Sequence, residues 1–349
     1  MMRPIKTGIL SYGMSGEVFH APLLNAHPGF DLIQIVQRSK NTAAAHYPMC
    51  RIVRSAEEVI QDPEIELVVV NTPNELHHHH VVQALKSGKH VVVEKPFTVS
   101  VAEADELMAM AKQLDRILTV FQNRRWDGDF LTLKHVLEQG WVGRVVEFEA
   151  HYDRFRNYIE PNTWKEEPGI GKGILYNLGS HMLDQVVVLF GMPAFVDARI
   201  GIQRTGGRVD DFYDLRLTYP GINVIVKSSY LVREPGPRYQ LHGTEGSYVA
   251  SSNIDPQEQA LKEKQTPGGE GWGAMPQETW GKLNTTLDGQ HVQKRIPTIP
   301  GNYLGYYDSV YAAIREGKPL AVTAEQARDV IRLIEAAYES NRERCAIKL

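Results

Sequence analysis

Two short runs of branched apolar residues constrain the fold of this chain more than any other feature. Leu67–Val70 and His90–Val93 show no alternation of apolar and polar side chains. Strands of this composition are covered on both faces, as in a parallel sheet with helices on each side. Residues 75–87 between them have helical character and end at Gly88, which suits a helix C-terminus. The two runs therefore predict a β-α-β unit.

The first third of the chain repeats this alternation of strand and helix. Residues 7–10 and 32–36 are further strand candidates, with a helical stretch to about residue 26 between them. Ser100 and Glu103 form a capping-box pattern at the start of another helix. Alternation at this pitch predicts a doubly wound α/β sheet, a Rossmann dinucleotide-binding domain, over residues 1–121.

The pattern changes after residue 121. A helix is expected at 130–139 and a closing amphipathic helix at 323–342, whereas the polar, Gly- and Pro-rich tract 254–290 is expected to be a long excursion or loop. Strands with polar alternation are expected at 145–156, 194–203, 212–219 and 223–230. Residues 122–349 are therefore predicted to form a C-terminal α+β domain with a large, mostly antiparallel open sheet.

Composition excludes several functional classes. Of 349 residues, 42% are hydrophobic and 23% charged, as in an ordinary globular protein, and the net charge of -4 gives no reason to expect nucleic acid or an anionic membrane as partner. Cys50 and Cys345 lie nearly the full chain apart, so no disulfide framework is expected. The N-terminus lacks the apolar core of a signal peptide, and no apolar run approaches the ~20 residues of a membrane span. These features predict a cytoplasmic protein.

A glycine-rich turn follows the first strand. Ser11, Gly13 and Gly16 occupy the three glycine positions of a G-x-G-x-x-G pattern, and Ser15 lies beside the last. Gly13 would let the backbone approach a pyrophosphate, Gly16 would allow close helix–strand packing, and the helix N-terminus supplies amide donors. A plain strand-to-helix turn is the alternative. The position of the pattern between the first strand and the first helix favours a dinucleotide site.

The residues after the second strand indicate which dinucleotide binds. An NAD enzyme usually has Asp or Glu there, for the ribose hydroxyls. This chain has Gln37-Arg38-Ser39-Lys40, in which Arg38 can make a paired contact with a 2′-phosphate and Ser39 can add a donor. A solvated basic loop is the alternative. We therefore expect NADP as cofactor, with NAD possible.

Two groups of residues suit oxidation of an alcohol. Glu94 and Lys95 follow the strand His90–Val93 at once, and a charged pair at a strand end is a site candidate because buried charge is costly. Lys95 can steady a developing alkoxide. Asn177 and His181, four residues apart, share one helix face, and His181 can exchange a proton near neutral pH. A packed or capping histidine is the alternative.

Longer stretches carry a family resemblance. Residues 71–77 (NTPNELH) and 84–97 (ALKSGKHVVVEKPF) resemble the glucose–fructose oxidoreductase/inositol dehydrogenase (Gfo/Idh/MocA) family over essentially the whole chain. Residues 121–127, 153–156 and 300–303 are similar to the branch that contains NADP-dependent scyllo-inositol dehydrogenases. The resemblance implies catalytic roles for Lys95 and His181. The family usually has Asp where this chain has Asn177, and a neutral amide can orient the imidazole but cannot stabilise its charge.

The resemblance also implies the cofactor contacts. Glu94 and Asn74 would lie near the nicotinamide and its ribose, and the Lys95–Pro96 peptide would be cis. Further contacts are implied for Thr72, Pro73, His77, Asn123 and Arg124. The run of four histidines that starts at His77 does not predict a metal site, because consecutive helical side chains point in different directions.

A polyol substrate needs several hydrogen-bond partners. The candidates are Tyr152, Arg154, Asn157, Trp164, Tyr176 and Asp184, each of which has a packing role as its alternative. Tyr152 and Arg154 lie on one face of their strand and Asp153 on the other.

Two classes of function remain open. The first is a reversible NADP-dependent dehydrogenase of a cyclic polyol or sugar, with an aldose or another sugar as the alternative substrate. The second is a non-catalytic NADP-binding regulator on the same fold, which Asn177 keeps open. The open sheet of the second domain suggests self-association, and the resemblance implies a homodimer or homotetramer.

Overall fold

The computed structural model describes residues 3–161, 163–250 and 255–349. The chain forms two compact units, each built from three segments. The first unit joins Met1–Trp126 with Pro256–Trp272 and Asn302–Arg328, and the second joins Asp127–Asp255, Gly273–Gly301 and Asp329–Leu349. The sequence pattern indicates one boundary, after residue 121, and gives no sign of the two returns to the first unit.

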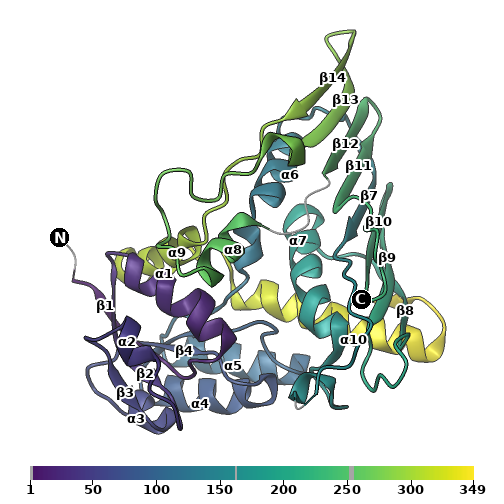
Figure 1. Ribbon diagram of the computed structural model, residues 1–349. Coiled ribbons are helices and arrows are strands. Elements are labelled where there is room, and N and C mark those ends of the chain that lie inside the picture. Colours follow the sequence, from purple (N-terminus) through teal and green to yellow (C-terminus); the bar gives the residue numbers. More distant parts are fainter. Residues whose placement is uncertain (1–2, 162, 251–254) are drawn as a thin grey trace. The chain divides into compact units, whose positions relative to one another are not determined.

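The first unit contains a six-stranded parallel sheet in the order β3-β2-β1-β4-β5-β6. Its strands are β1 (Ile5–Ile9), β2 (Phe30–Val36), β3 (Arg51–Val53), β4 (Leu67–Val70), β5 (His90–Val93) and β6 (Leu118–Val120). Its helices are η1 (Gly16–His20), α1 (Ala21–Ala26), α2 (Ala43–His46), α3 (Ala56–Ile60), η2 (Asn74–Leu76), α4 (His77–Lys86), α5 (Val101–Gln113), η3 (Asn123–Trp126), α8 (Pro256–Lys262) and α9 (Leu304–Glu316). Helices α1 and α9 lie on one side of the sheet and α3 and α4 on the other (Figure 1). The predicted Rossmann fold is confirmed.

The central strands are buried as their composition predicts. All four residues of β4, and Val91 to Val93 of β5, have no exposed surface. The strand order changes direction between β1 and β4. In open parallel sheets the ligand crevice lies outside the carboxyl ends of the strands at such a switch point. The first unit therefore has the topology that a dinucleotide site requires.

The second unit contains a nine-stranded sheet in the order β14-β13-β12-β11-β7-β10-β9-β8-β15. Among these described strands β7 and β10 pair in parallel and the other neighbours are antiparallel. The strands are β7 (Val145–His151), β8 (Phe195–Gly201), β9 (Phe212–Tyr219), β10 (Ile222–Ser229), β11 (Tyr239–Gly243), β12 (Gly246–Ala250), β13 (Gly281–Leu287), β14 (Gln290–Ile296) and β15 (Ile347–Lys348). The predicted mostly antiparallel sheet is confirmed.

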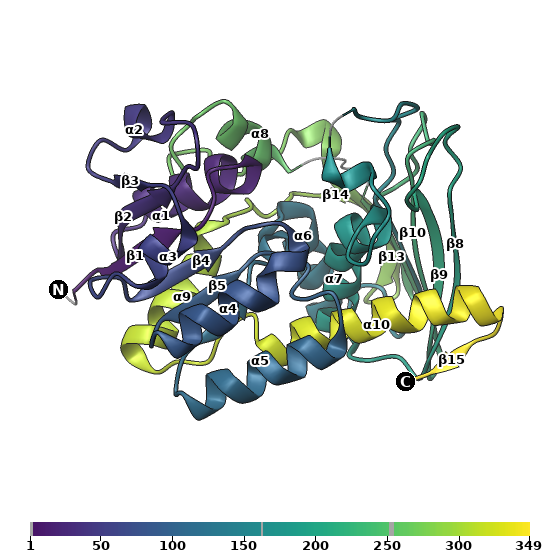
Figure 2. The same cartoon turned by 90° about the horizontal axis from the view of Figure 1, so that it is seen from below.

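Helices cover one face of this sheet. They are α6 (Gly128–Glu138), η4 (Trp164–Glu166), η5 (Leu175–Gly179), α7 (Ser180–Phe190), η6 (Gln277–Thr279) and α10 (Ala324–Glu343), which begins in the last segment of the first unit. Both views show α6 and α7 on the same side of the strands (Figures 1 and 2). The Tyr213 hydroxyl of β9 lies 3.1 Å from Met182 Sδ of α7, whereas Asp214 and Arg216 alternate onto the opposite face.

Three expectations for the second half of the chain are corrected. The tract 254–290 is not a long loop, because its described part, from residue 255, contains α8, η6 and β13. Strand β13 is polar on alternate residues because one face of an antiparallel sheet meets water, which hides it in a polar tract. The sequence pattern also does not predict strands β11 and β12, which are joined by a tight turn. Strand β7 ends at His151 rather than at residue 156.

Within the described ranges, no helix combines the length and the hydropathy that crossing a membrane would require.

A buried arginine connects the sheet of the second unit to α6. The Arg238 guanidinium lies 3.1 Å from an Asp127 carboxylate oxygen and 3.2 Å from one of Asp129. All three side chains are at most 5% exposed. Removing one partner of such a cluster leaves uncompensated charge in the interior.

We predict that Arg238→Ala lowers the free energy of unfolding by about 3–5 kcal/mol, because two buried carboxylates lose their counter-charge. Arg208→Ala is the matched control, since Arg208 and Glu167 form an ion pair of 3.0 Å with both side chains mostly exposed. The free energy of unfolding of this control variant should fall by less than about 1 kcal/mol. Urea denaturation of the two variants measures the difference. Equal losses would contradict this account of the second unit.

Candidate active site

The glycine turn between β1 and η1 is closely packed. A Cβ on Gly16 would lie 2.1 Å from the Ser11 carbonyl oxygen, so this position has room only for glycine. Gly13 is exposed, and its amide lies 3.2 Å from Ser11 Oγ. Ser15, half-buried, directly precedes η1. Gly16 therefore has the packing role that the pattern predicts, and Gly13 presents bare backbone.

Asn71, at the carboxyl end of β4, stabilises the glycine turn through a side-chain hydrogen bond. Its Nδ2 donates to the Ser11 carbonyl at 2.8 Å. Its Oδ1 is buried and has no hydrogen-bond partner among the described residues. A buried acceptor without a donor is costly. An unsatisfied acceptor beside exposed turn backbone fits a dinucleotide, whose hydroxyl and amide groups can donate.

The end of β2 presents a basic residue to solvent. The Gln37 side chain is buried and bonds Thr42 Oγ1 and the Ala43 amide, both at 2.9 Å, so Gln37 shapes the loop. Arg38 and Ser39 are exposed. Arg38 makes no ion pair in the part of the chain that the structure describes. Its guanidinium is therefore available to an anionic group.

Glu94 and Lys95 follow β5, and the Lys95–Pro96 peptide is cis as the resemblance implies. One Glu94 oxygen accepts from the Lys95 amide at 3.0 Å. The other lies 3.0 Å from His20 Nε2. Burial alone would raise the pKa of Glu94, but the hydrogen bond from His20 and the charge of Lys95 lower it overall. The carboxylate is therefore ionised at neutral pH.

His20 is a site residue that the sequence pattern does not reveal. It is fully buried, and its Nδ1 lies 2.7 Å from the Tyr307 hydroxyl of α9. The only sequence signal is a histidine among the apolar residues that follow the glycine turn. A core histidine looks the same in sequence, because its partners lie 74 and 287 residues away.

The loops after β4 and β5 are joined by His77. This side chain is fully buried, with Nδ1 3.0 Å from the Pro96 carbonyl and Nε2 3.0 Å from the Thr72 carbonyl. Burial lowers its pKa. Thr72, Pro73 and Asn74 of the same loop are half-buried. His77 thus ties together the two loops that carry the other predicted contacts.

The histidine run takes separate partners. His78 pairs with Glu106 at 3.0 Å, and His80 lies 3.1 Å from the Thr72 hydroxyl. Among the described residues, no group of three or more His, Cys, Asp or Glu side chains could hold a metal ion.

Asn123 and Arg124 of η3 are buried. The Arg124 guanidinium pairs with Glu258 of α8. Burial would raise the pKa of Glu258, but the charge of Arg124 and the hydrogen bonds from Lys262 and Arg124 together lower that pKa to about 2. The Arg124 side chain thus forms an ion pair that connects η3 to α8 within the first unit.

In the second unit the predicted catalytic residues lie on consecutive helical turns. Tyr176 and Asn177 belong to η5, a π-helical turn, and His181 and Asp184 to α7. Asn177 is half-buried, whereas the other three are nearly or fully buried. Single π-helical turns inside longer helices are frequent at functional sites.

Asp210 holds the start of this helix in place. The sequence pattern does not reveal this role of Asp210. One of its carboxylate oxygens accepts from the Leu175 amide at 3.0 Å and the other from the Tyr338 hydroxyl at 2.8 Å. The Tyr338 ring stacks on Tyr176 at a centroid distance of 5.8 Å. A Cβ on Gly173, where φ is +89°, would lie 2.0 Å from Asp210. Burial raises the pKa of Asp210.

The chain beyond β7 presents the predicted substrate residues. The Arg154 guanidinium lies 5.3 Å from the centroid of the Tyr152 ring, so the two share a face. Asp153 points away and accepts from His151 Nδ1 at 3.1 Å. Asn157 is exposed. The side chain of Trp164 lies outside the described part of the structure.

The predicted residues thus form one group in each unit. The first unit has the glycine turn, the β4 and β5 ends and the exposed Arg38. The second has the η5–α7 helix and the segment after β7.

Models of one protein family match both parts of the chain. Residues 5–122 match the model described as oxidoreductase family, NAD-binding Rossmann fold. Residues 134–349 match the model described as oxidoreductase family, C-terminal alpha/beta domain. Together the two matches span nearly the whole chain.

Individual relatives agree over the full length. The scyllo-inositol 2-dehydrogenase (NADP(+)) IolW of Bacillus subtilis is 40% identical over 345 residues, which cover 99% of this chain and 96% of that protein. The solved structure of the oxidoreductase yvaA from Bacillus subtilis has a TM-score of 0.96 at 40% identity and covers 99% of both chains. An oxidoreductase structure from Bacteroides fragilis has a TM-score of 0.92 at 45% identity and covers 99% of this chain and 100% of that one.

Proposed function

The chain belongs to the Gfo/Idh/MocA oxidoreductase family and is an NAD(P)-dependent dehydrogenase of CH–OH groups; we propose that it uses NADP to oxidise a scyllo-inositol-like cyclic polyol. The observation that carries the proposal is the carboxyl end of β5, where the charged residues Glu94 and Lys95 follow three fully buried valines. The 40% identical relative is named for this substrate and cofactor. Unpaired Cys50 and Cys345 fit the reducing cytoplasm, where we place the activity.

In the proposed reaction two side chains, Lys95 and His181, have separate roles. A nicotinamide dinucleotide, when bound, supplies the hydride acceptor. Lys95 donates a hydrogen bond to the reacting oxygen, and its charge stabilises the alkoxide that develops there. His181 accepts the hydroxyl proton. Asn177, four residues earlier, orients the imidazole without adding charge, so proton transfer depends on the intrinsic basicity of His181 and on Lys95.

We predict that NADP is reduced with one or more inositols or aldoses, and that Lys95→Ala lowers kcat by about 10²-fold or more because the alkoxide loses its cation. Lys86→Ala, which removes an exposed lysine at the end of α4, should leave kcat unchanged. The measurement is absorbance of the reduced nicotinamide across the substrate panel. Tight NADP binding without turnover on any substrate would favour the regulator instead.

Arg38 supports the choice of NADP, since it is exposed where NAD enzymes have an acidic residue. We predict that Arg38→Ala lowers kcat/KM for NADP about tenfold or more, through loss of a charge-assisted contact with the 2′-phosphate. The value for NAD, which lacks this phosphate, should change little and is the internal control. Steady-state kinetics with both cofactors measures the effect. Wild-type protein that prefers NAD, or uses both equally, would contradict the proposal.

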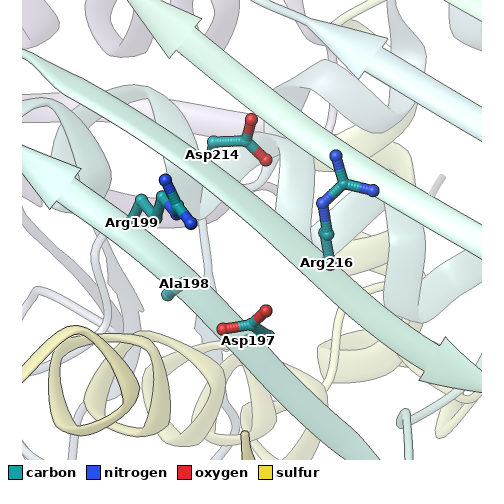
Figure 3. A pocket seen from close by; sticks show the side chains of 5 residues that line it. All are labelled: Asp197, Ala198, Arg199, Asp214 and Arg216. Carbon is teal, nitrogen blue, oxygen red and sulfur yellow. The ribbon is translucent and has the colours of Figure 1, made fainter. Parts of the chain in front are cut away.

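We also propose that the outer face of the nine-stranded sheet joins two copies of the chain. Arg216 lies opposite Asp197 in the β8–β9 register, and Arg199 lies opposite Asp214. These four side chains surround a hollow of about 320 Å³ (Figure 3). Charges of opposite sign face each other across the two strands, so a second copy turned over about a two-fold axis parallel to the strands sets each positive charge against a negative one. The patch is therefore complementary to a second copy of itself. An isologous dimer needs such a surface.

We predict a dimer or tetramer by light scattering at micromolar concentration. The double substitution Arg199→Glu, Arg216→Glu should shift it towards monomer, because the patch then carries charges of one sign. Arg208→Glu, an exposed charge reversal elsewhere in the same unit, should not. A monomeric wild-type protein would refute the proposal.

A further inference from the structure

We propose that His20 is a positioning residue that holds the Glu94 carboxylate in place, and that through this carboxylate the site favours the oxidised nicotinamide over the reduced one. The inference rests on the proposed function, because it assumes that the first unit binds a nicotinamide dinucleotide. It assigns a role to two buried residues, His20 and Tyr307, that the proposed chemistry leaves unused.

The hydrogen-bond directions in this network follow from the groups present. Burial raises the pKa of Tyr307 well above its usual value, so the phenol keeps its proton. The Glu94 carboxylate oxygen can only accept, so His20 Nε2 carries a proton and donates to Glu94 Oε1 at 3.0 Å. In the tautomer that has its proton on Nε2, His20 Nδ1 accepts from the Tyr307 hydroxyl at 2.7 Å. The chain of donors runs from Tyr307 through His20 to Glu94.

Both oxygens of the Glu94 carboxylate are thereby fixed. Oε1 accepts from His20 and Oε2 accepts from the Lys95 amide at 3.0 Å. The other ionisable groups that influence it are Lys95, His77 and the two tyrosines of α9, Tyr306 and Tyr307. Those tyrosines stay neutral because burial raises their pKa values, and burial lowers the pKa of His77. Glu94, whose side chain is 12% exposed, is the negative charge in this group.

The position of Glu94 in the sheet determines which part of a bound dinucleotide its charge can act on. A doubly wound fold binds one mononucleotide on each half of its sheet. The half with β1 and β2 has the glycine turn and Arg38, which suit the adenosine side. Glu94 follows β5 in the other half, which is left for the nicotinamide. The oxidised ring is cationic and the reduced ring is neutral, so a fixed carboxylate in this half stabilises the oxidised form more.

His20 is itself fixed by its surroundings. Its ring lies against Phe121, with a centroid distance of 4.3 Å, and has no exposed surface. Without the bond, burial would raise the pKa of Glu94 and favour the neutral acid. The charge that discriminates between the two cofactor forms would then be weakened.

The test compares dissociation constants of oxidised and reduced cofactor, measured by fluorescence titration without substrate. We expect the ratio of the reduced to the oxidised constant to fall about fivefold or more in His20→Leu, as one fixed charge is lost at moderate distance. Glu94→Gln should lower it similarly, and His20→Gln, which keeps a donor, should restore part of it. His27→Leu is the matched control, because His27 is buried and bonds α9 through Asp308 at 3.0 Å without touching Glu94.

The outcomes separate this inference from the proposed function. An unchanged ratio in a folded His20→Leu protein overturns the inference while leaving the proposed function intact. A wild-type protein that binds neither cofactor form overturns both. If His20→Leu does not fold, Tyr307→Phe removes the donor to Nδ1 and should lower the ratio in the same direction. No change in that variant would count against the inference equally.

Discussion

The near-complete burial of β4 and β5, in which only His90 is partly exposed, is the constraint on which the first unit depends. Side chains that lie on both faces of a helix-covered sheet must be apolar, and neither strand has an exposed valine. Polar functional side chains can then occur only beyond the end of each strand. Asn71 and Glu94 are the residues at those two points, and because the strands are parallel, both lie along the same edge as the glycine turn.

The two half-buried carboxylates, Glu94 and Asp210, show that the hydrogen-bonding partners determine whether a carboxyl group is ionised. Both are desolvated, which by itself raises a carboxyl pKa. Glu94 faces an imidazole and an ammonium group, and its pKa is lowered. Asp210 is bonded by a phenol and backbone amides, which are neutral, and its pKa is raised. One carboxylate is suited to electrostatics at neutral pH, and the other to anchoring the start of η5.

Sequence patterns predict the features that are local in the chain. The uniform runs at β4 and β5, the glycine turn and the strand-end lysine are each visible within a few residues, and the parallel sheet follows from them. His20 and Asp210 are not visible in this way, because their roles depend on Tyr307 and Tyr338, which are brought near only by folding. Strand β13 was hidden for a different reason: its water-facing residues make a true strand look like a polar loop.

The three-segment composition of the first unit has a consequence for biosynthesis. Tyr307 belongs to the segment Asn302–Arg328, so the donor chain to Glu94 lacks its first member until synthesis has passed this residue. The segment Met1–Trp126 contains all the strands of the parallel sheet but lacks α8 and α9. Truncation after the sixth strand would therefore yield an incomplete nucleotide-binding unit, and no single proteolytic cut can separate the two units intact.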